Sequence, residues 1–201
     1  RHNRRAMNEA EVARFLMCAD EDDRREAARS KADMTIDHGT KGRLYVIRER
    51  RRRIPQRPLW EALIATGARW SELTRSAWGD VDVERATLTL RAEHTKSGNL
   101  RIIPLQRELV SLLTNLRALQ IDIVRTGMSD ADRIFLTPEA YQWPRVTRNA
   151  MRIFERILNI AEIAKTNVQG ETLDIHALRH TFASRLARAG VGLLQAQKLL
   201  G

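Results

Sequence analysis

Cysteine is almost absent from this chain: Cys18 is the single cysteine among 201 residues. One thiol has no partner for a disulfide within the chain and cannot supply the thiolates of a zinc–cysteine site. This excludes a disulfide framework and favours a reducing, cytoplasmic setting. No apolar run approaches the ~20 residues that span a bilayer, and the first residues do not resemble a secretory signal. We therefore expect no membrane association.

Acidic residues are also in deficit, with 25 Asp and Glu against 35 Lys and Arg and a formal net charge of +10. Such an excess is typical of proteins that bind a polyanion, most often nucleic acid. A basic protein without such a partner is the alternative. The acidic run from Asp20 to Asp23 places its carboxylates around a helix instead of toward one point. It predicts a solvated surface, and we expect no metal or other cofactor.

Apolar residues recur at helical spacing along most of the chain and, at 43% of it, suffice for one sizeable domain over residues 1–201. Asn8 and Glu11 have the spacing of a capping box and predict a helix start. The charge-dense segment 21–58 predicts an irregular or partly helical insertion. Its basic run, Arg50 to Arg53, is expected to face solvent.

From residue 59 onward the pattern is more regular. It predicts a helix over 59–65 that Gly67 ends in a C′ position. Alternating residues at 86–93, a turn at 95–99 and a returning segment at 100–105 predict a β-hairpin. Further helices are expected over 69–78, 107–124, 145–164, 174–190 and 192–200. The predicted fold is mainly α-helical with a small antiparallel β-sheet, in the α+β class.

Cationic and proton-handling side chains gather in the helix that Asp174 is expected to cap. His176 falls in the first turn, Arg179 in the second, and His180 follows on the same face. A helix N-terminus favours anions, and the planar fork of an arginine matches two oxygens of a phosphate. A histidine beside them can exchange a proton near neutral pH. For so short a pattern, packing histidines and a surface arginine remain the alternative.

Two other cations can each be interpreted either as a site residue or as an ordinary surface charge. Lys96 lies beside the Ser-Gly-Asn turn of the hairpin, where it can donate a proton, contact a phosphate or simply be an exposed turn lysine. Arg69 begins the helix predicted over 69–78 and is either part of a site or a surface arginine paired with Glu72.

The order of these motifs is more specific than any one of them. The chain contains, in sequence, TGARWSEL, TKSGNLRIIPL, HALRHTFASRLARAG and QAQKLLG. Together they resemble the catalytic domain of the tyrosine recombinases, the family of phage-type integrases. The resemblance covers about residues 8–20 and 59–201.

This resemblance implies roles for individual residues. Arg69 and Arg179 would hold the non-bridging oxygens of the scissile phosphate, and Lys96 would protonate the leaving 5′ oxygen. His176 would handle the proton of the nucleophile. Glu72 and His180 would be supporting residues. The chemistry agrees, because preorganised cations stabilise the charge that builds up on a phosphodiester under attack.

The chain departs from the family pattern at Ala68, Trp70 and Ala177, where packing is expected to change more than chemistry. The nucleophilic tyrosine has no counterpart here, because neither Tyr45 nor Tyr141 occupies its expected place. We expect that tyrosine beyond Gly201. Since residue 1 is arginine, we also expect an excised core that lacks an amino-terminal DNA-clamping domain and does not cleave DNA alone.

The expected partner is double-stranded DNA, bound by a tetramer in the prokaryotic cytoplasm and associated with the nucleoid. The basic residues expected to contact it are Arg101 near the hairpin tip and, at a helix start, Arg145 and Arg148, although each is as readily a solvated charge. Two other functions stay open. One is a non-catalytic DNA-binding regulator with a helix-turn-helix near 71–78 or 146–157, and the other is a nicking topoisomerase.

Overall fold

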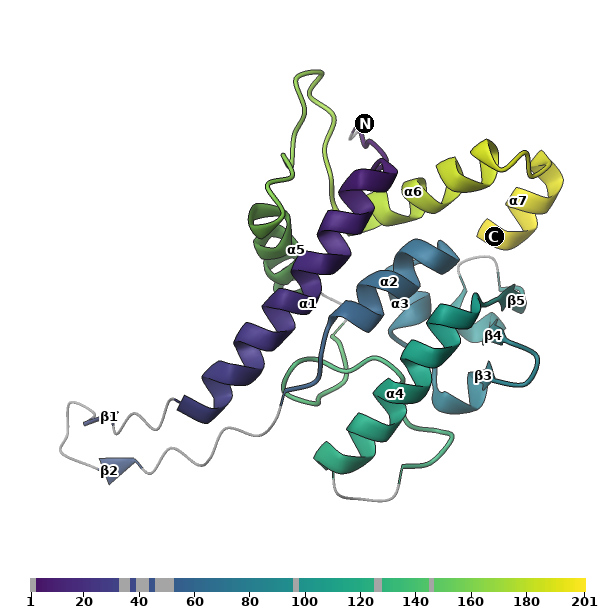
Figure 1. The fold of residues 1–201 in the computed structure, drawn as a ribbon. Helices are drawn as coiled ribbons and strands as arrows, with labels where there is room; N and C mark the ends of the chain where they lie inside the picture. The colour runs from purple at the N-terminus through teal and green to yellow at the C-terminus, as the bar shows by residue number, and fades with distance from the viewer. Residues whose placement is uncertain are drawn as a thin grey trace.

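The computed structural model describes residues 3–32, 37–38, 44–45, 53–95, 98–124, 128–144 and 147–201. Helix α2 (Arg57–Thr66) lies centrally, and α1 (Glu9–Ala32), α4 (Arg107–Val124) and α6 (Ile175–Arg188) pack against it (Figure 1). Helix α5 (Arg148–Ile160) packs on α1, and α7 (Leu193–Leu200) contacts α6 and the sheet. The predicted fold class, mainly helical with a small antiparallel sheet, is confirmed. No described helix is long and apolar enough to cross a membrane.

The sheet contains β3 (Val81–Asp82), β4 (Thr87–Leu90) and β5 (Arg101–Pro104), paired antiparallel in that order. The predicted hairpin is confirmed, with Leu90 opposite Arg101, and short 3-10 turns lie at Trp78–Asp80 and Ala92–His94. The strand β3 was not predicted, because two residues are too few to show an alternating pattern. A separate pair, β1 (Asp37–His38) and β2 (Leu44–Tyr45), lies within the charged segment.

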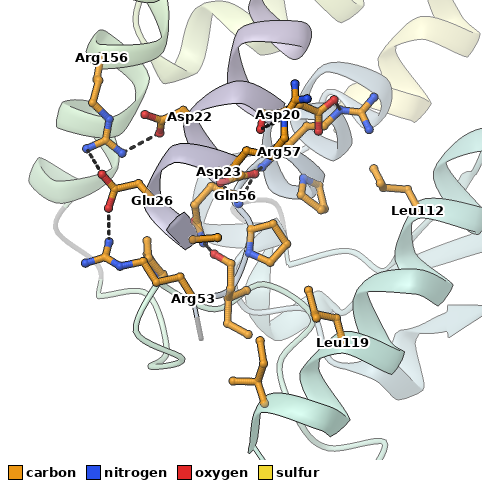
Figure 2. A pocket seen from close by; sticks show the side chains of 17 residues that line it. Asp20, Asp22, Asp23, Glu26, Arg53, Gln56, Arg57, Leu112, Leu119 and Arg156 are labelled. Carbon is orange, nitrogen blue, oxygen red and sulfur yellow. Dashed lines mark hydrogen bonds and ion pairs between the residues drawn. The ribbon is translucent and has the colours of Figure 1, made fainter. Parts of the chain in front are cut away.

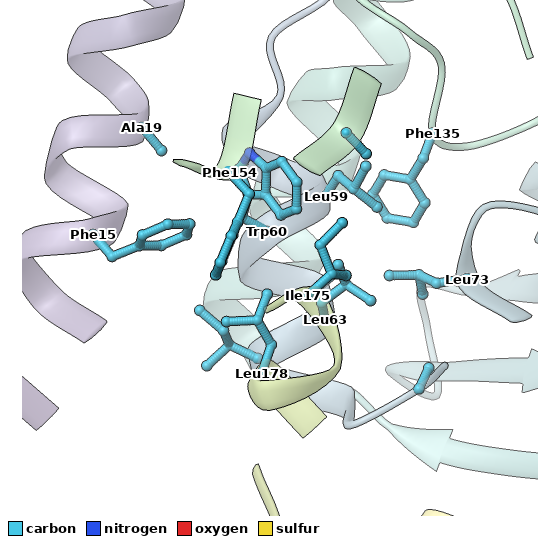
Figure 3. Close-up of a cluster of buried hydrophobic side chains, with 14 of the residues drawn as sticks. Phe15, Ala19, Leu59, Trp60, Leu63, Leu73, Phe135, Phe154, Ile175 and Leu178 are labelled. Atoms are coloured by element: carbon cyan, nitrogen blue, oxygen red, sulfur yellow. The ribbon is translucent and has the colours of Figure 1, made fainter. Parts of the chain in front are cut away.

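The core is built on α2. Trp60 of this helix packs against Phe15 of α1 and Phe154 of α5, with ring centroids 6.2 and 5.7 Å away, and all three rings are fully buried (Figure 3). Tilted and edge-on ring pairs at such distances are favourable beyond their buried area. Three helices from distant parts of the sequence are thereby held around one indole.

Helix α1 begins as predicted and ends later. The capping box is confirmed, because the Glu11 N–H donates to Asn8 and the Asn8 N–H donates to Glu11, at 2.8 and 2.9 Å. The helix then continues to Ala32, so residues 21–32 of the predicted irregular or partly helical segment are helical. Beyond Ala32, much of the predicted insertion lies outside the described residues.

Two of the four acidic residues, Asp22 and Asp23, are not on a solvated surface, which corrects the prediction for them, whereas the side chains of Asp20 and Glu21 are partly exposed (Figure 2). Asp22 is 4% exposed and pairs with Arg156 of α5 at 2.7 Å. The Asp23 carboxylate accepts the backbone N–H groups of Gln56 and Arg57 at 2.8 Å, and so satisfies donors that the first turn of α2 leaves unpaired. Arg53 likewise pairs with Glu26 at 2.8 Å, whereas Arg50 to Arg52 lie outside the described residues.

Candidate active site

The C-terminal end of α2 is where the site begins. Gly67 follows the helix in the left-handed conformation, with φ of +60°, and its N–H donates to Leu63 O at 3.1 Å. Glycine is required here twice over. A side chain would be strained at this φ, and a Cβ would collide with the ring of Phe182 on α6. The predicted C′ position of Gly67 is confirmed, and two residues later the chain reaches Arg69.

Arg69 precedes the short helix α3 (Trp70–Leu73), which is shorter than the helix predicted over 69–78. Its backbone N–H donates to Glu72 Oε2 at 2.9 Å and its Nη1 donates to Glu72 Oε1 at 2.7 Å. These bonds fix both ends of the Arg69 residue against one carboxylate. The predicted pairing of Arg69 with Glu72 is therefore present, but the pair is not a surface one, because Glu72 is 1% exposed.

Arg179 comes from the other side, on α6. Asp174 caps this helix as predicted, accepting the Ala177 N–H at 2.9 Å, and places Arg179 in the second turn. Arg179 Nη1 donates to the carbonyl oxygen of Gly67 at 2.9 Å. The turn at Gly67 thus precedes Arg69 by two residues in the sequence, and its carbonyl oxygen orients Arg179.

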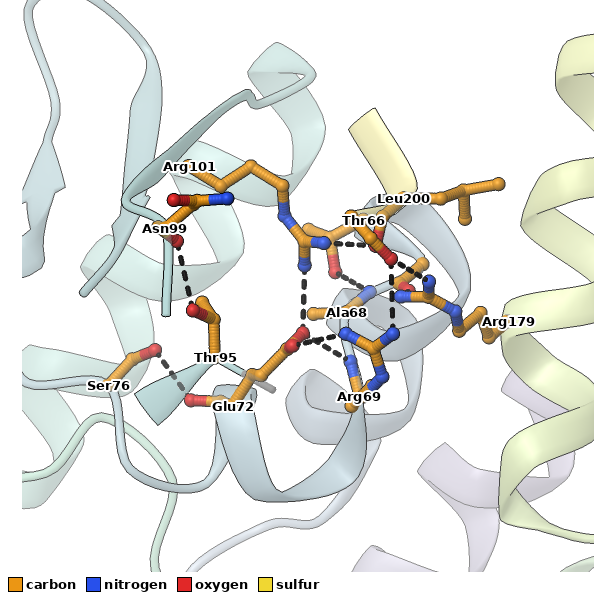
Figure 4. A network of polar contacts seen from close by, with 12 residues as sticks. Thr66, Ala68, Arg69, Glu72, Ser76, Thr95, Asn99, Arg101, Arg179 and Leu200 are labelled. Atoms are coloured by element: carbon orange, nitrogen blue, oxygen red, sulfur yellow. Dashed lines mark hydrogen bonds and ion pairs between the residues drawn. The ribbon is translucent and has the colours of Figure 1, made fainter. Parts of the chain in front are cut away.

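The two guanidinium groups meet at one point (Figure 4). Arg69 Nη2 and Arg179 Nη2 each donate to the carbonyl oxygen of Gly201, at 3.0 and 3.1 Å. Residues 110 positions apart in the sequence therefore hold a single oxygen between them. Two arginine forks aimed at one acceptor make a receptor for an oxyanion such as a carboxylate or a phosphate.

Arg101 is where the sequence interpretation of the hairpin needs correction. It was predicted near an exposed hairpin tip, yet it is 8% exposed and begins β5. Its Nη2 donates to Glu72 Oε2 at 2.8 Å, and its Nη1 donates to the carbonyl oxygen of Leu200. The side chain turns inward, where its charge is paired with the buried carboxylate of Glu72.

Positive charge exceeds negative charge in this group. Arg69 and Arg101 pair with the single carboxylate of Glu72, and Arg179 shares the oxygen of Gly201 with Arg69. The four side chains carry an excess of two positive charges. Burial, followed by the charge of Arg69, lowers the pKa of Arg179 to about 10. The Arg179 guanidinium remains protonated at neutral pH, in a position where an anion would be stabilised.

His176 opens onto the same place. A cavity of about 180 Å³ is lined by both His176 and Arg179, with Ala68 and Trp70 also in its wall. Burial, followed by the charge of Arg4, lowers the pKa of His176 below its ordinary value. The imidazole is accordingly neutral at neutral pH and able to accept a proton.

The other predicted residues are less closely gathered. His180 is exposed, with its ring centroid 5.5 Å from that of His176. Arg148 is exposed at the first residue of α5, and Tyr141 is 71% exposed in a turn closed by the Thr137 N–H and the Tyr141 carbonyl. Lys96, Arg145 and the side chain of Tyr45 lie outside the described residues.

Three positions were not anticipated from the sequence. They are the carbonyl of Gly67, the inward turn of Arg101, and Arg4, whose Nε donates to Asp174 at 2.6 Å beside the site. No periodicity or spacing links these positions, which are brought together by packing. Within the described residues, no group of three or more His, Cys, Asp or Glu side chains is placed to hold a metal ion.

Comparison with known proteins shows the family of this chain. The model of the phage integrase family matches residues 41–201, most of the chain. The chain belongs to the phage integrase family. Its sequence is 29% identical over 153 residues to the tyrosine recombinase XerC of Roseiflexus sp. (strain RS-1), a match of 74% of this chain and 44% of the relative. It is 31% identical over 141 residues to XerD of Yersinia pestis, covering 70% of this chain and 44% of that protein.

Solved structures agree on the fold of this integrase-family chain. The XerA recombinase superposes with a TM-score of 0.64 at 22% identity, over 100% of this chain and 57% of that chain. The catalytic domain of bacteriophage HP1 integrase superposes with a TM-score of 0.57 at 22% identity, over 99% of this chain and 81% of that chain. The XerH recombinase bound to difH substrate superposes with a TM-score of 0.65 at 19% identity, over 100% of this chain and 48% of that chain. The chain spans less than half the length of the curated XerC and XerD relatives.

Proposed function

We propose that this chain is the catalytic core of a site-specific DNA recombinase that breaks and rejoins strands through a phosphotyrosyl intermediate. The observation that carries the proposal is the meeting of Arg69 and Arg179 on one oxygen, at 3.0 and 3.1 Å. Membership of the integrase family supports it, as do the DNA complexes among the structures of similar fold.

In this proposal the oxygen of Gly201 marks the place of a non-bridging oxygen of the scissile phosphate. Both are acceptors that a pair of guanidinium forks can bind. A phosphodiester carries one negative charge, and attack on phosphorus raises this to about two in the transition state. The excess of two positive charges around Glu72 suits the transition state better than the ground state.

The reaction forms one bond and breaks one. A tyrosine oxygen attacks phosphorus and loses its proton to His176, whose lowered pKa keeps the imidazole neutral. The bond from phosphorus to the 5′ oxygen breaks, and Lys96 supplies the proton that this oxygen takes up. The result is a 3′-phosphotyrosyl bond and a free 5′ hydroxyl. Since the phosphoester energy is conserved in that bond, the reverse reaction rejoins strands without an added energy source.

The tyrosine is proposed to come from outside the chain described here, and the whole enzyme to act as a tetramer on two duplexes. Tyr141 is not proposed as the nucleophile. Its side chain is exposed, and its backbone is tied to Thr137 in a turn that follows α4. Double-stranded DNA is the proposed partner, with Arg148 among the exposed cations available to contact it.

The test is a trapped-substrate assay with the complete natural polypeptide and a duplex that carries its recombination site and a nick next to the scissile phosphate. Loss of the short nicked fragment prevents rejoining, so a covalent protein–DNA adduct accumulates. The adduct is expected to disappear when the nucleophilic tyrosine is changed to phenylalanine, while DNA binding persists.

Other outcomes identify the alternative functions. Sequence-specific DNA binding without any adduct would contradict the proposal and favour a regulator. A recognition helix near residues 71–78 is already disfavoured, because α3 has four residues and its Glu72 and Leu73 are buried. Adduct formation together with relaxation of supercoils at any sequence would instead indicate a nicking topoisomerase.

A further inference from the structure

Arg101 connects three elements that meet at the site. It begins β5, its Nη2 donates to Glu72 of α3, and its Nη1 donates to the carbonyl oxygen of Leu200 at the end of α7 (Figure 4). At 8% exposure its guanidinium has little surface left for a phosphate of DNA. The residue thus borders the oxyanion receptor without pointing into it.

The sharing of Glu72 explains what Arg101 does. Glu72 Oε2 accepts from both Arg101 Nη2 and the Arg69 backbone N–H, and Oε1 accepts from Arg69 Nη1. This leaves Arg69 Nη2 available for the oxygen at the site. A buried carboxylate that lost Arg101 would draw the whole Arg69 fork toward itself, because an uncompensated charge in the interior is costly.

We propose that Arg101 is a positioning residue for strand cleavage: by holding Glu72 it directs Arg69 at the scissile phosphate. The inference rests on the proposed function. It assigns to Arg101 a role in the rate of the chemical step instead of a role in DNA affinity.

The same hairpin offers a matched control. Arg91, at the exit of β4, also pairs with a buried carboxylate: its Nε donates to Asp80 at 2.6 Å, and Asp80 is 6% exposed. The Asp80 carboxylate also accepts the Ala77 N–H, so this pair braces the turn before β3 and not the arginines of the site. Arg91→Met therefore removes the arginine from another buried carboxylate next to the same sheet, one that does not contact Arg69.

The experiment compares Arg101→Met, Arg101→Lys and Arg91→Met in the complete natural polypeptide, after melting curves have shown that each variant folds. Arg101→Met is expected to slow single-turnover adduct formation about 100-fold, with DNA affinity and its salt dependence unchanged. Arg91→Met is expected to leave the rate near that of the wild type. Arg101→Lys keeps the charge but not the fork that reaches both Glu72 and Leu200, so partial recovery is expected.

A double variant tests the route through Glu72. If Arg101 acts by holding that carboxylate, Arg101→Met has little further effect on the rate in a Glu72→Gln background, whereas independent effects would multiply. The inference is overturned if the two effects multiply, if Arg91→Met slows the reaction as much, or if Arg101→Met lowers the salt slope by about one, the value of a lost phosphate contact. A wild-type protein that forms no adduct would overturn the proposed function itself, and this inference with it.

Discussion

The two ends of α2 carry two charged clusters that differ in their balance of charge. At the N-terminal end, carboxylates from α1 meet arginines and backbone N–H groups: Asp23 accepts from Gln56 and Arg57, Asp22 from Arg156, and Glu26 pairs with Arg53 (Figure 2). At the C-terminal end, Arg69 and Arg101 pair with Glu72, and Arg179 shares the oxygen of Gly201 with Arg69 (Figure 4). Both are dense in charge, yet cations are in excess only at the second.

We propose that the first cluster serves stability and the second serves function. In the first cluster each of the three arginines pairs with a carboxylate, and the result joins α1, α2 and α5. In the second, Arg69 and Arg179 each have a donor that is not paired with a carboxylate. Both donors point at the backbone oxygen of Gly201. Unbalanced charge, held rigidly, is what a site for a charged transition state requires.

Removing one arginine from each cluster is the strongest test of this division. Arg179→Ala is expected to lower the rate of adduct formation about 100- to 1000-fold with little change in the free energy of unfolding. Arg156→Ala is expected to leave the rate nearly unchanged but to lower the free energy of unfolding by about 1–2 kcal/mol, because buried Asp22 loses its partner. Trapped-substrate kinetics and urea melts measure both. Equal effects on rate would refute the division.

Lys96 extends the test to the leaving group. Lys96→Ala is expected to slow cleavage about 100-fold or more, as for a lost general acid. A substrate with sulfur in place of the leaving 5′ oxygen should restore most of the rate, because a thiolate leaves without protonation. Arg179→Ala is the control, and its defect should persist with the sulfur substrate. No rescue of Lys96→Ala would contradict the assigned role.

The pH dependence of cleavage should report His176. Its pKa is lowered, chiefly by burial and then by Arg4, so the neutral base is present above a pKa lying below ~6.5. The rate is therefore expected to fall as the pH drops through that pKa. His176→Gln should be about 100-fold slower and lack this acidic limb. His180→Gln is the matched control. This variant is expected to keep the fall in rate at low pH.

Gly67 tests how the fold supports the second cluster. Gly67→Ala is expected to lower the free energy of unfolding by about 2 kcal/mol and also to slow cleavage, because the turn at Gly67 orients Arg179. Gly190, after α6, has a similar φ of +72°, but a Cβ there would meet open space. Gly190→Ala should therefore cost about 1 kcal/mol and leave cleavage intact. Urea melts of both variants give the comparison.

Asp23 provides the smallest effect, at the N-terminal cluster. Burial raises the pKa of Asp23 to about 6. The hydrogen bonds from the backbone N–H groups of Arg57 and Gln56 act in the opposite direction but are outweighed. A raised pKa in the folded state means that the contribution of this carboxyl to stability is present below its ordinary pKa and is lost as the pH rises through about 6. Asp23→Asn should flatten the pH dependence of unfolding between pH ~4 and ~6. An unchanged dependence would contradict the assignment.

Local signals were read correctly from the sequence. The capping box of Asn8 and Glu11, the C′ glycine at 67, the cap at Asp174 and the hairpin each depend on residues a few positions apart, and each is present. The acidic run and Arg101 were misread for one common reason. A charged side chain looks solvated until a partner from another element, Arg156 or Glu72, is brought beside it.

Composition was enough to show the excess of positive charge, and spacing along the chain was enough to predict most of the helices, the hairpin and the order of the motifs that resemble the family. Only the tertiary structure decided which arginines share an oxygen and which neutralise a carboxylate. The packing of α6 against the end of α2 is what brings Arg179 to the turn before Arg69. Contacts across 110 residues are set by the fit of buried surfaces, which no local pattern records.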